Sequence, residues 1–165
     1  MVDEETRNDP AALLRTIEKF EVERLFVPFV ALQQLADSAL SLGLVPSSLK
    51  EIITAGEQLI INQSLVKFFE QLPACRLVNQ YGPTECHVVT AYTLEGSPGD
   101  WPALPPIGKA IAGAHAYVLD ENMDPVQKGE PGELCIGGRA VARGYYLQAE
   151  KTGEKFLSDP FSSES

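Results

Sequence analysis

The sequence predicts an α/β fold: a parallel sheet with crossover helices in the N-terminal part, followed by a β-rich part that forms a partial barrel. Two observations support this fold class. In the first half of the chain, segments with helical periodicity alternate with short runs rich in β-branched residues, which is typical of parallel strands joined by helices. The segment from Gly96 to Pro106 then holds four prolines and two glycines, and after it strands predominate.

Three helices are predicted before that boundary. Asp9-Pro10 is a favourable start for the first, Pro10–Glu21, because Asp caps the first turn and Pro fits within it. The second, Phe29–Leu40, is followed by Gly43, which interrupts helical structure. The third, Asn62–Leu72, carries apolar residues at helical spacing.

Short strands alternate with these helices. They are Leu25–Val27, Lys50–Thr54, Cys75–Val78 and Val88–Tyr92. In open parallel sheets, ligands bind beyond the carboxyl ends of the strands. Ala55-Gly56-Glu57 and Gln80–Glu85 both follow such ends, so we expect these two segments to lie on one rim of the sheet.

Beyond the proline-rich loop, the pattern predicts strands at Ala114–Leu119 and Glu133–Ile136, and a short helix at Gln148–Phe156. The tail, Ser158–Ser165, is polar, and we expect it to be disordered.

The chain of 165 residues is long enough to bury a sizeable core. We expect two parts: an α/β part over residues 1–95, and a β-rich part with a short helix and a polar tail over residues 96–165.

Composition narrows the classes of function. The net charge of −10 disfavours binding to a nucleic-acid backbone, which needs a basic surface. No apolar stretch approaches the length that spans a membrane, and the acidic Met1–Pro10 segment is no signal peptide. The three cysteines are not spaced as a metal site, so we expect them to be reduced thiols in a cytoplasmic protein. From the charge and the lack of a long apolar stretch, we expect neither nucleic-acid nor membrane partners.

The segment Asn79-Gln80-Tyr81-Gly82-Pro83-Thr84-Glu85 combines the groups that a nucleotide site needs. A ring can stack on a base, an amide can bond to a base edge, a hydroxyl can donate to a phosphate, and a carboxylate can ligate Mg²⁺. On composition alone, an ordinary turn is the better explanation, because Asn, Gly, Pro and Thr are common turn residues.

The spacing favours a nucleotide site, because the segment resembles the Asn-x-Tyr-Gly-Pro-Thr-Glu motif of amino-acid adenylation domains from nonribosomal peptide synthetases. These domains belong to the adenylate-forming (AMP-binding) enzyme superfamily. Other segments resemble motifs of the same family in the same order: Thr54–Glu57, Gly132–Gly138 and Ala142–Tyr145, followed by Thr152 and Lys155-Phe156. The resemblance runs from about Asp3 to Phe161.

The resemblance implies an ATP-dependent ligase. Such an enzyme joins an amino-acid carboxylate to the α-phosphate of ATP, releases pyrophosphate, and passes the acyl group to the phosphopantetheine thiol of a carrier domain. Asn79 would hydrogen-bond the adenine of ATP or AMP, and Tyr81 would stack against it. Thr84 would contact the α-phosphate and Glu85 would ligate Mg²⁺, so these two are the expected catalytic residues. Gly56 would let the backbone pass close to the adenylate.

The resemblance also implies an acyl pocket. Its wall would include Phe26, Ile53, Ala55, Gln80, Val88 and Val89. This set is apolar apart from one amide, and it would suit a medium-sized aliphatic side chain such as leucine. The competing explanation is that strand residues are apolar because strands are buried.

Several family segments have no counterpart in this sequence, among them a phosphate-binding loop and a lid with a catalytic lysine. We therefore expect an internal fragment of an adenylation domain, which would be inactive by itself. Such a fragment would expose apolar surface and could self-associate.

Two other classes of function stay open. One is a fragment of an enzyme that adenylates an acyl or aryl acid. The other is a non-catalytic α/β module that binds nucleotide or serves only as structure. Ala142–Tyr145 with the later Lys155-Phe156, and the Phe29–Gln34 run, favour the peptide synthetase branch.

Overall fold

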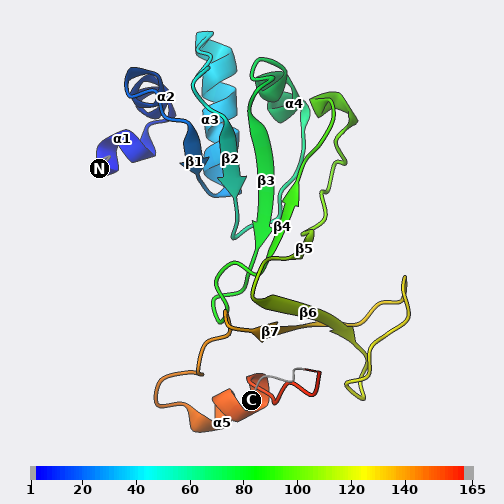
Figure 1. Ribbon diagram of the computed structural model, residues 1–165. Helices are drawn as coiled ribbons and strands as arrows, with labels where there is room; N and C mark the ends of the chain where they lie inside the picture. The colour runs from blue at the N-terminus through cyan, green and yellow to red at the C-terminus, as the bar shows by residue number, and fades with distance from the viewer. Residues whose placement is uncertain (1–2, 162–165) are drawn as a thin grey trace. The chain divides into compact units, whose positions relative to one another are not determined.

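The structure, a computed structural model, describes residues 3–161 (Figure 1). The chain divides into two compact units. Unit 1 comprises residues 1–80 and 92–108, and unit 2 comprises residues 81–91 and 109–165. The chain therefore leaves unit 1 after residue 80 and returns to it at residue 92, whereas the predicted division makes one cut after residue 95; that boundary stays a prediction.

Five strands form one sheet in the order in which they follow along the chain, and Figure 1 shows this succession. They are β1 (Arg24–Phe26), β2 (Glu51–Thr54), β3 (Arg76–Tyr81), β4 (Thr90–Thr93) and β5 (Lys109–Ala110). The β1–β2 and β2–β3 pairs are parallel, and the β4–β5 pair is antiparallel. The predicted parallel sheet with crossover helices is confirmed.

In unit 1, side-chain caps mark the start of some helices, and a left-handed glycine ends one of them. They are α1 (Glu4–Asn8), α2 (Pro10–Lys19), α3 (Phe29–Leu42) and α4 (Gln63–Glu70). Asp3 and Asp9 accept hydrogen bonds from the first turns of α1 and α2. Gly43 ends α3 with a left-handed φ of 64°. The short helix α1 has no counterpart among the helices predicted from the sequence.

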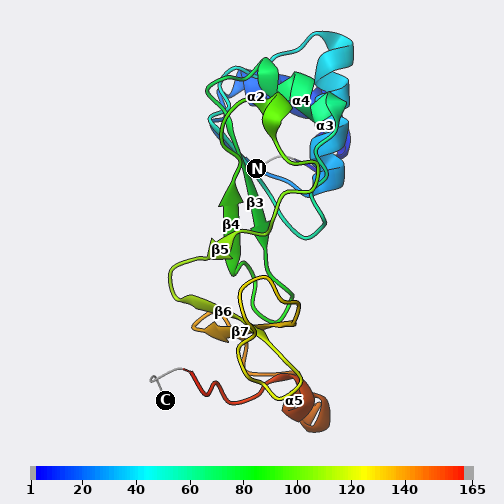
Figure 2. The ribbon, with the colours of Figure 1, turned by 90° about the vertical axis from the view of Figure 1, so that its right-hand side faces the viewer.

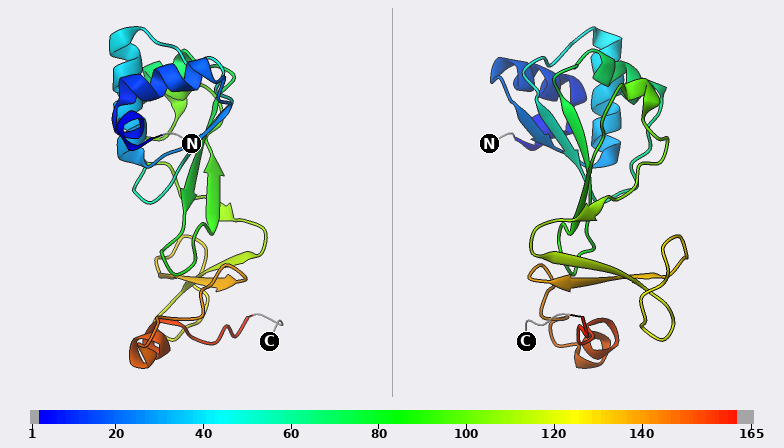
Figure 3. Two further views of the ribbon diagram at one scale, coloured as in Figure 1. Left: turned by 90° about the vertical axis from the view of Figure 1, so that its left-hand side faces the viewer. Right: turned by 45° about the vertical axis from the view of Figure 1, so that its right-hand side comes forward.

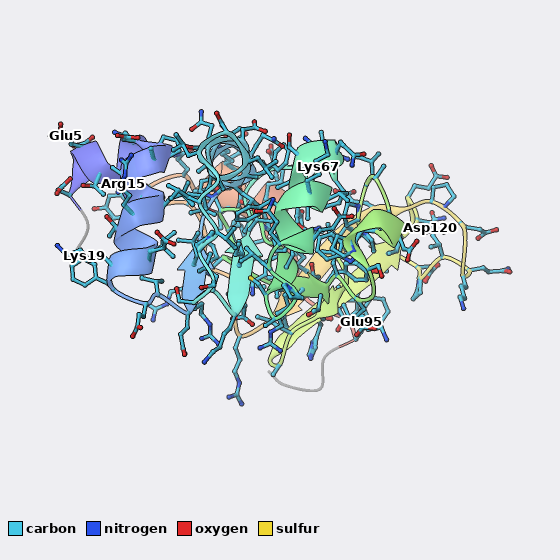
Figure 4. All side chains as sticks on the ribbon, turned by 90° about the horizontal axis from the view of Figure 1, so that it is seen from above. Glu5, Arg15, Lys19, Lys67, Glu95 and Asp120 are labelled. Atoms are coloured by element: carbon cyan, nitrogen blue, oxygen red, sulfur yellow. The ribbon has the colours of Figure 1, made fainter. Side chains whose placement is uncertain are left out.

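In unit 1, an apolar core forms between the helices and one face of the parallel strands. Ile52 and Leu77 are paired in register, and both are fully buried against α2, α3 and α4. Figures 2 and 3 show α3 running alongside these strands. Charged side chains such as Arg15 of α2 and Lys67 of α4 lie on the outer surfaces of their helices, where they are exposed and labelled in Figure 4.

The opposite face of the same strands is more open. Because side chains alternate along a strand, Phe26 and Ile53, which are paired in register, lie on the face away from the helices. Phe26 is 58% exposed. At the start of the strands, Glu51 forms ion pairs with Arg24 at 2.5 Å and with Arg76 at 2.8 Å, so one carboxylate links three parallel strands.

Unit 2 is built on an antiparallel pair, β6 (Ala114–Leu119) and β7 (Glu133–Gly138), followed by α5 (Ala149–Lys155). The predicted β-rich second part is confirmed. The predicted disordered tail is partly wrong, because Phe161 packs on Tyr117 of β6 with ring centroids 4.9 Å apart. Residues 162–165 of that tail lie outside the described residues.

Within residues 3–161, none of the helices is both long and apolar enough to cross a membrane.

Candidate functional site

The segment Asn79–Glu85 begins in a strand and ends in a loop. Its first three residues belong to β3, so the prediction that this strand ends at Val78 is wrong. The reason is pairing: Asn79 lies opposite Thr54 of β2, and the Tyr81 carbonyl accepts a hydrogen bond from Val89 N at 2.8 Å. The two units divide between Gln80 and Tyr81, so the candidate residues are described in two groups.

In unit 1, Asn79 is held by its own protein. Its side chain is 4% exposed, and its Nδ2 donates to the carbonyl of Pro106 at 3.0 Å. Its neighbour across the strands, Thr54, is 1% exposed, and within the described residues the Thr54 hydroxyl has no hydrogen-bond partner. The amide is therefore fixed in the structure before any ligand is considered.

Gly56 is exposed and has a φ of +91°, a backbone angle that favours glycine. A Cβ atom built on Gly56 would meet no protein atom within 4 Å, so the protein itself leaves room for a side chain. The predicted close passage of the backbone by an adenylate stays a prediction. Glu57, the next residue, stabilises the first turn of α3, because its Oε2 accepts a hydrogen bond from Val30 N. The motif gave no indication of this contact.

The predicted pocket wall is divided between the units. Phe26 and Ile53 are partners on neighbouring strands, and Ala55 and Gln80 are half-buried. In unit 2, Val88 is half-buried and Val89 is fully buried in a small core with Cys86 and Ala114. The structure thus brings Phe26 and Ile53 together on one face.

The loop after β3 folds tightly back on itself in unit 2. A Cβ atom on Gly82 would lie 1.4 Å from the carbonyl oxygen of His87 and 2.7 Å from Val88 Cα. Only glycine fits there without moving the backbone. The glycine of the motif is therefore required by packing within the loop.

Glu85 is anchored by its backbone and its side chain. Its carbonyl accepts a hydrogen bond from Ala142 N at 2.8 Å, and its Oε1 accepts one from the Tyr145 hydroxyl. The hydrogen bond from Tyr145 is the largest influence that lowers the pKa of Glu85, and the positive charges of Lys151 and Lys155 lower it further. The carboxylate is thus ionised at neutral pH. Thr84, beside it, is exposed.

Tyr145 is itself held by α5. Its N–H donates to Thr152 Oγ1 at 2.9 Å, and its ring meets the Phe156 ring edge to face with centroids 5.4 Å apart. Gly144, at a φ of +136°, allows this approach, because a Cβ there would lie 2.4 Å from Thr152 Cγ2. These residues are recognisable in the sequence as a motif, but their contact with Glu85, 60 positions away, is not.

A cavity of about 500 Å³ lies within unit 2. Tyr81 and Glu85 line it together with Tyr145 and Phe156, whereas Thr84 and Val88 do not. Two of the residues predicted to hold the nucleotide and its metal therefore share one cavity.

The donor set fits a magnesium ion that takes most of its ligands from elsewhere. Among the described residues, no group of three or more His, Cys, Asp or Glu side chains could hold a metal ion. Mg²⁺ in nucleotide sites is held by one or two carboxylates together with phosphate oxygens and water. Glu85, ionised and with one oxygen bonded to Tyr145, offers the single carboxylate that such a site needs.

Comparisons with known proteins agree on one family. A family model described as "AMP-binding enzyme" matches residues 1–146. The chain is 37% identical over 161 residues to gramicidin S synthase 2 of Brevibacillus brevis, covering 98% of this chain and 4% of that protein. It is 40% identical over 157 residues to the phosphinothricin tripeptide synthetase PhsB of Streptomyces viridochromogenes, covering 93% of this chain and 12% of that protein.

Among solved structures, the nonribosomal peptide synthetase FmoA3 matches with a TM-score of 0.81 and 24% identity, over 94% of this chain and 17% of that one. This likeness shows the fold. The chain spans a small share of the length of the relatives that it matches.

Proposed function

The chain belongs to the AMP-binding enzyme family, and on that premise we propose that it is part of a domain that activates an amino acid with ATP. The amino-acid carboxylate attacks the α-phosphate, and an aminoacyl-adenylate and pyrophosphate form. The acyl group then passes to the phosphopantetheine thiol of a carrier domain. Similarity to a tripeptide synthetase and to gramicidin S synthase 2 supports an amino acid as the substrate.

The observation that carries this proposal is the cavity in unit 2 that Tyr81 and the anchored Glu85 both line. Tyr81 offers a face on which adenine can stack, and Glu85 offers a hard, ionised oxygen. The exposed Thr84 hydroxyl is the proposed donor to the α-phosphate. Asn79 and Gly56 are the proposed contacts of adenine and adenylate in unit 1.

Catalysis in this proposal is positioning and neutralisation of charge, which is the main requirement of displacement at phosphorus. None of these residues need act as a general base, because an amino-acid carboxylate is already ionised at neutral pH. Thr84 would orient the α-phosphate, and Glu85 would hold the cation close to the phosphates. Bound Mg²⁺ would supply positive charge to the phosphate oxygens.

Of the expected wall residues, Phe26, Ile53, Ala55 and Gln80 are at least partly exposed in unit 1, and they favour a medium-sized aliphatic side chain in the substrate. Free cysteines at positions 75, 86 and 135 support a cytoplasmic location.

The exposed Phe26 ring supports self-association of the chain, which sedimentation at several protein concentrations would detect.

The test is calorimetric titration of the chain with Mg·ATP and with AMP. We expect Tyr81→Ala to weaken both ligands, because both present adenine for stacking. Glu85→Gln keeps the size of the side chain but removes its charge, so it should weaken Mg·ATP more than AMP. The matched control is Glu121→Gln, an exposed residue of unit 2 that does not line the cavity.

The proposed binding roles of Tyr81 and Glu85 in this chain fail if the folded chain binds neither ligand, or if Glu85→Gln and Glu121→Gln bind Mg·ATP alike. Circular dichroism of each variant would separate a loss of binding from a loss of structure.

A further inference from the structure

We propose that Tyr145 sets the cation preference of Glu85, favouring Mg²⁺ over Ca²⁺ by keeping one oxygen of the carboxylate occupied. The inference rests on the proposed function, in which Glu85 ligates the cation of the nucleotide. It assigns Tyr145 a positioning task, acting through Glu85.

The contact that carries the proposal is the hydrogen bond from the Tyr145 hydroxyl to Glu85 Oε1. With Oε1 bonded to the phenol, Oε2 is the oxygen that a cation can take. The backbone of Glu85 is held as well, because its carbonyl accepts a hydrogen bond from Ala142 N at 2.8 Å. Glu85 is therefore held at its backbone and at its side chain, and Oε2 is the carboxylate oxygen left for a cation.

The phenol is not free to move away from Glu85. The Tyr145 N–H bonds to Thr152 Oγ1, and the Phe156 ring meets the Tyr145 ring edge to face. On its face, the Lys151 ammonium lies 4.6 Å from the ring centroid. Three separate contacts from α5 and its C-terminal end thus keep the hydroxyl aimed at the carboxylate.

The two cations differ in what they require of a carboxylate. Mg²⁺ takes near-octahedral geometry at about 2.0–2.1 Å, keeps several waters, and is served by one carboxylate oxygen plus phosphate oxygens. Ca²⁺ takes about six to eight oxygens at longer distances and often uses both oxygens of one carboxylate. To bind Glu85 through both oxygens, Ca²⁺ would have to displace the Tyr145 hydroxyl. The hydrogen bond therefore penalises Ca²⁺ and leaves the mode that suits Mg²⁺ intact.

The experiment compares Mg·ATP and Ca·ATP binding to the wild-type chain and to Tyr145→Phe by calorimetry. Phe keeps the ring and its packing on Phe156 while removing the hydroxyl. We expect Tyr145→Phe to raise the affinity for Ca·ATP relative to Mg·ATP by about 2- to 10-fold, the effect of one hydrogen bond. The control is Tyr146→Phe, which removes a hydroxyl from the next residue, a tyrosine that is 87% exposed; its ratio should equal that of wild type.

The ratio of the two affinities is insensitive to a general loss of structure, which would weaken both cations alike. An unchanged ratio in Tyr145→Phe, or one that moves towards Mg²⁺, would overturn the inference. If Glu85→Gln still weakens Mg·ATP in that case, the proposed function stands. Absence of cation-dependent ATP binding in the wild type would overturn both.

Discussion

At the scale of the residue, two glycines of the family motifs are required for different physical reasons. Gly56 needs its left-handed φ of +91°, although a Cβ there would meet no protein atom within 4 Å. Gly82 needs space, because a Cβ there would overlap the carbonyl of His87. Both positions read as glycine in the sequence. The reason for glycine is the backbone angle at position 56 and the close neighbours at position 82.

Replacing Gly82 with alanine should lower the free energy of unfolding by roughly 1–3 kcal/mol or more, the usual range for overpacking. The added methyl group would overlap backbone atoms of His87 and Val88, which cannot move as a side chain can. Urea denaturation followed by circular dichroism measures this. The matched control is Gly153→Ala inside α5, where a Cβ meets no atom within 4 Å. It should stabilise by about 0.5–1 kcal/mol, because alanine is the better helix former. Equal stabilities of the two variants would contradict the packing argument.

At the scale of the element, Asn62 connects two helices. Its Oδ1 accepts a hydrogen bond from Leu65 N at 3.1 Å and caps α4, while its Nδ2 donates to Gln33 Oε1 of α3 at 2.6 Å. The position of the cap was predictable from the sequence, since Asn is a preferred first residue. The partner on α3 was not, because it lies 29 residues away.

Asn62→Ala should lower the free energy of unfolding by about 0.5–2 kcal/mol, since the first turn of α4 then loses its cap. Asn62→Asp is the informative companion, because it keeps a capping oxygen, loses the donor to Gln33 and adds a charge that the N-terminus of α4 favours. Thermal melts of both variants separate the two contributions. A melting point of Asn62→Asp as low as that of Asn62→Ala would mean that the bond to Gln33, not the cap, dominates.

Elements were predicted well where the signal is local and poorly where pairing decides. Helical periodicity and caps located α2, α3 and α4 to within a few residues, and β6 begins and ends where expected. The end of β3 was missed, because the turn residues after Val78 are held extended by the neighbouring strand. The short α1 depends on the cap at Asp3 and carries no apolar stripe, which is why periodicity did not indicate it.

At the scale of the whole molecule, the two units have unequal cores. In unit 1, helices and strands share a large cluster that includes Leu32, Ile52 and Phe68. In unit 2, the cluster of buried residues consists of Cys86, Val89 and Ala114. Since buried apolar area is the main source of stability, the units should differ in how often they open.

We expect amide hydrogens of β6 and β7 to exchange with solvent faster than those of β2 and β3. Hydrogen-exchange mass spectrometry of the chain, with peptides assigned to each strand, measures the difference. The peptides of α3 provide the internal reference for unit 1. Equal protection of all four strands would show that the chain opens as one cooperative body.

Much of the candidate site was predictable as a set of residue types and only in part as an arrangement. The segment Asn79–Glu85 was identified from its letters, and the cavity contains Tyr81 and Glu85 as one group. The sequence could not show that Asn79 is already bonded to Pro106, or that Tyr145 holds Glu85. These contacts join residues 27 and 60 positions apart.

The sequence by itself determined the order of helices and strands, the places where chains of apolar residues would be buried, and the family to which the motifs belong. Those properties follow from periodicity, capping and turn residues, all of which act over a few neighbouring positions. Three features depend on the tertiary structure alone. They are the close contact that requires glycine at position 82, the hydrogen bond from Val30 N to Glu57 in the first turn of α3, and the Glu85 oxygen that remains for a cation. Each of these depends on atoms that meet only after the chain has folded, because local periodicity carries no record of distant partners.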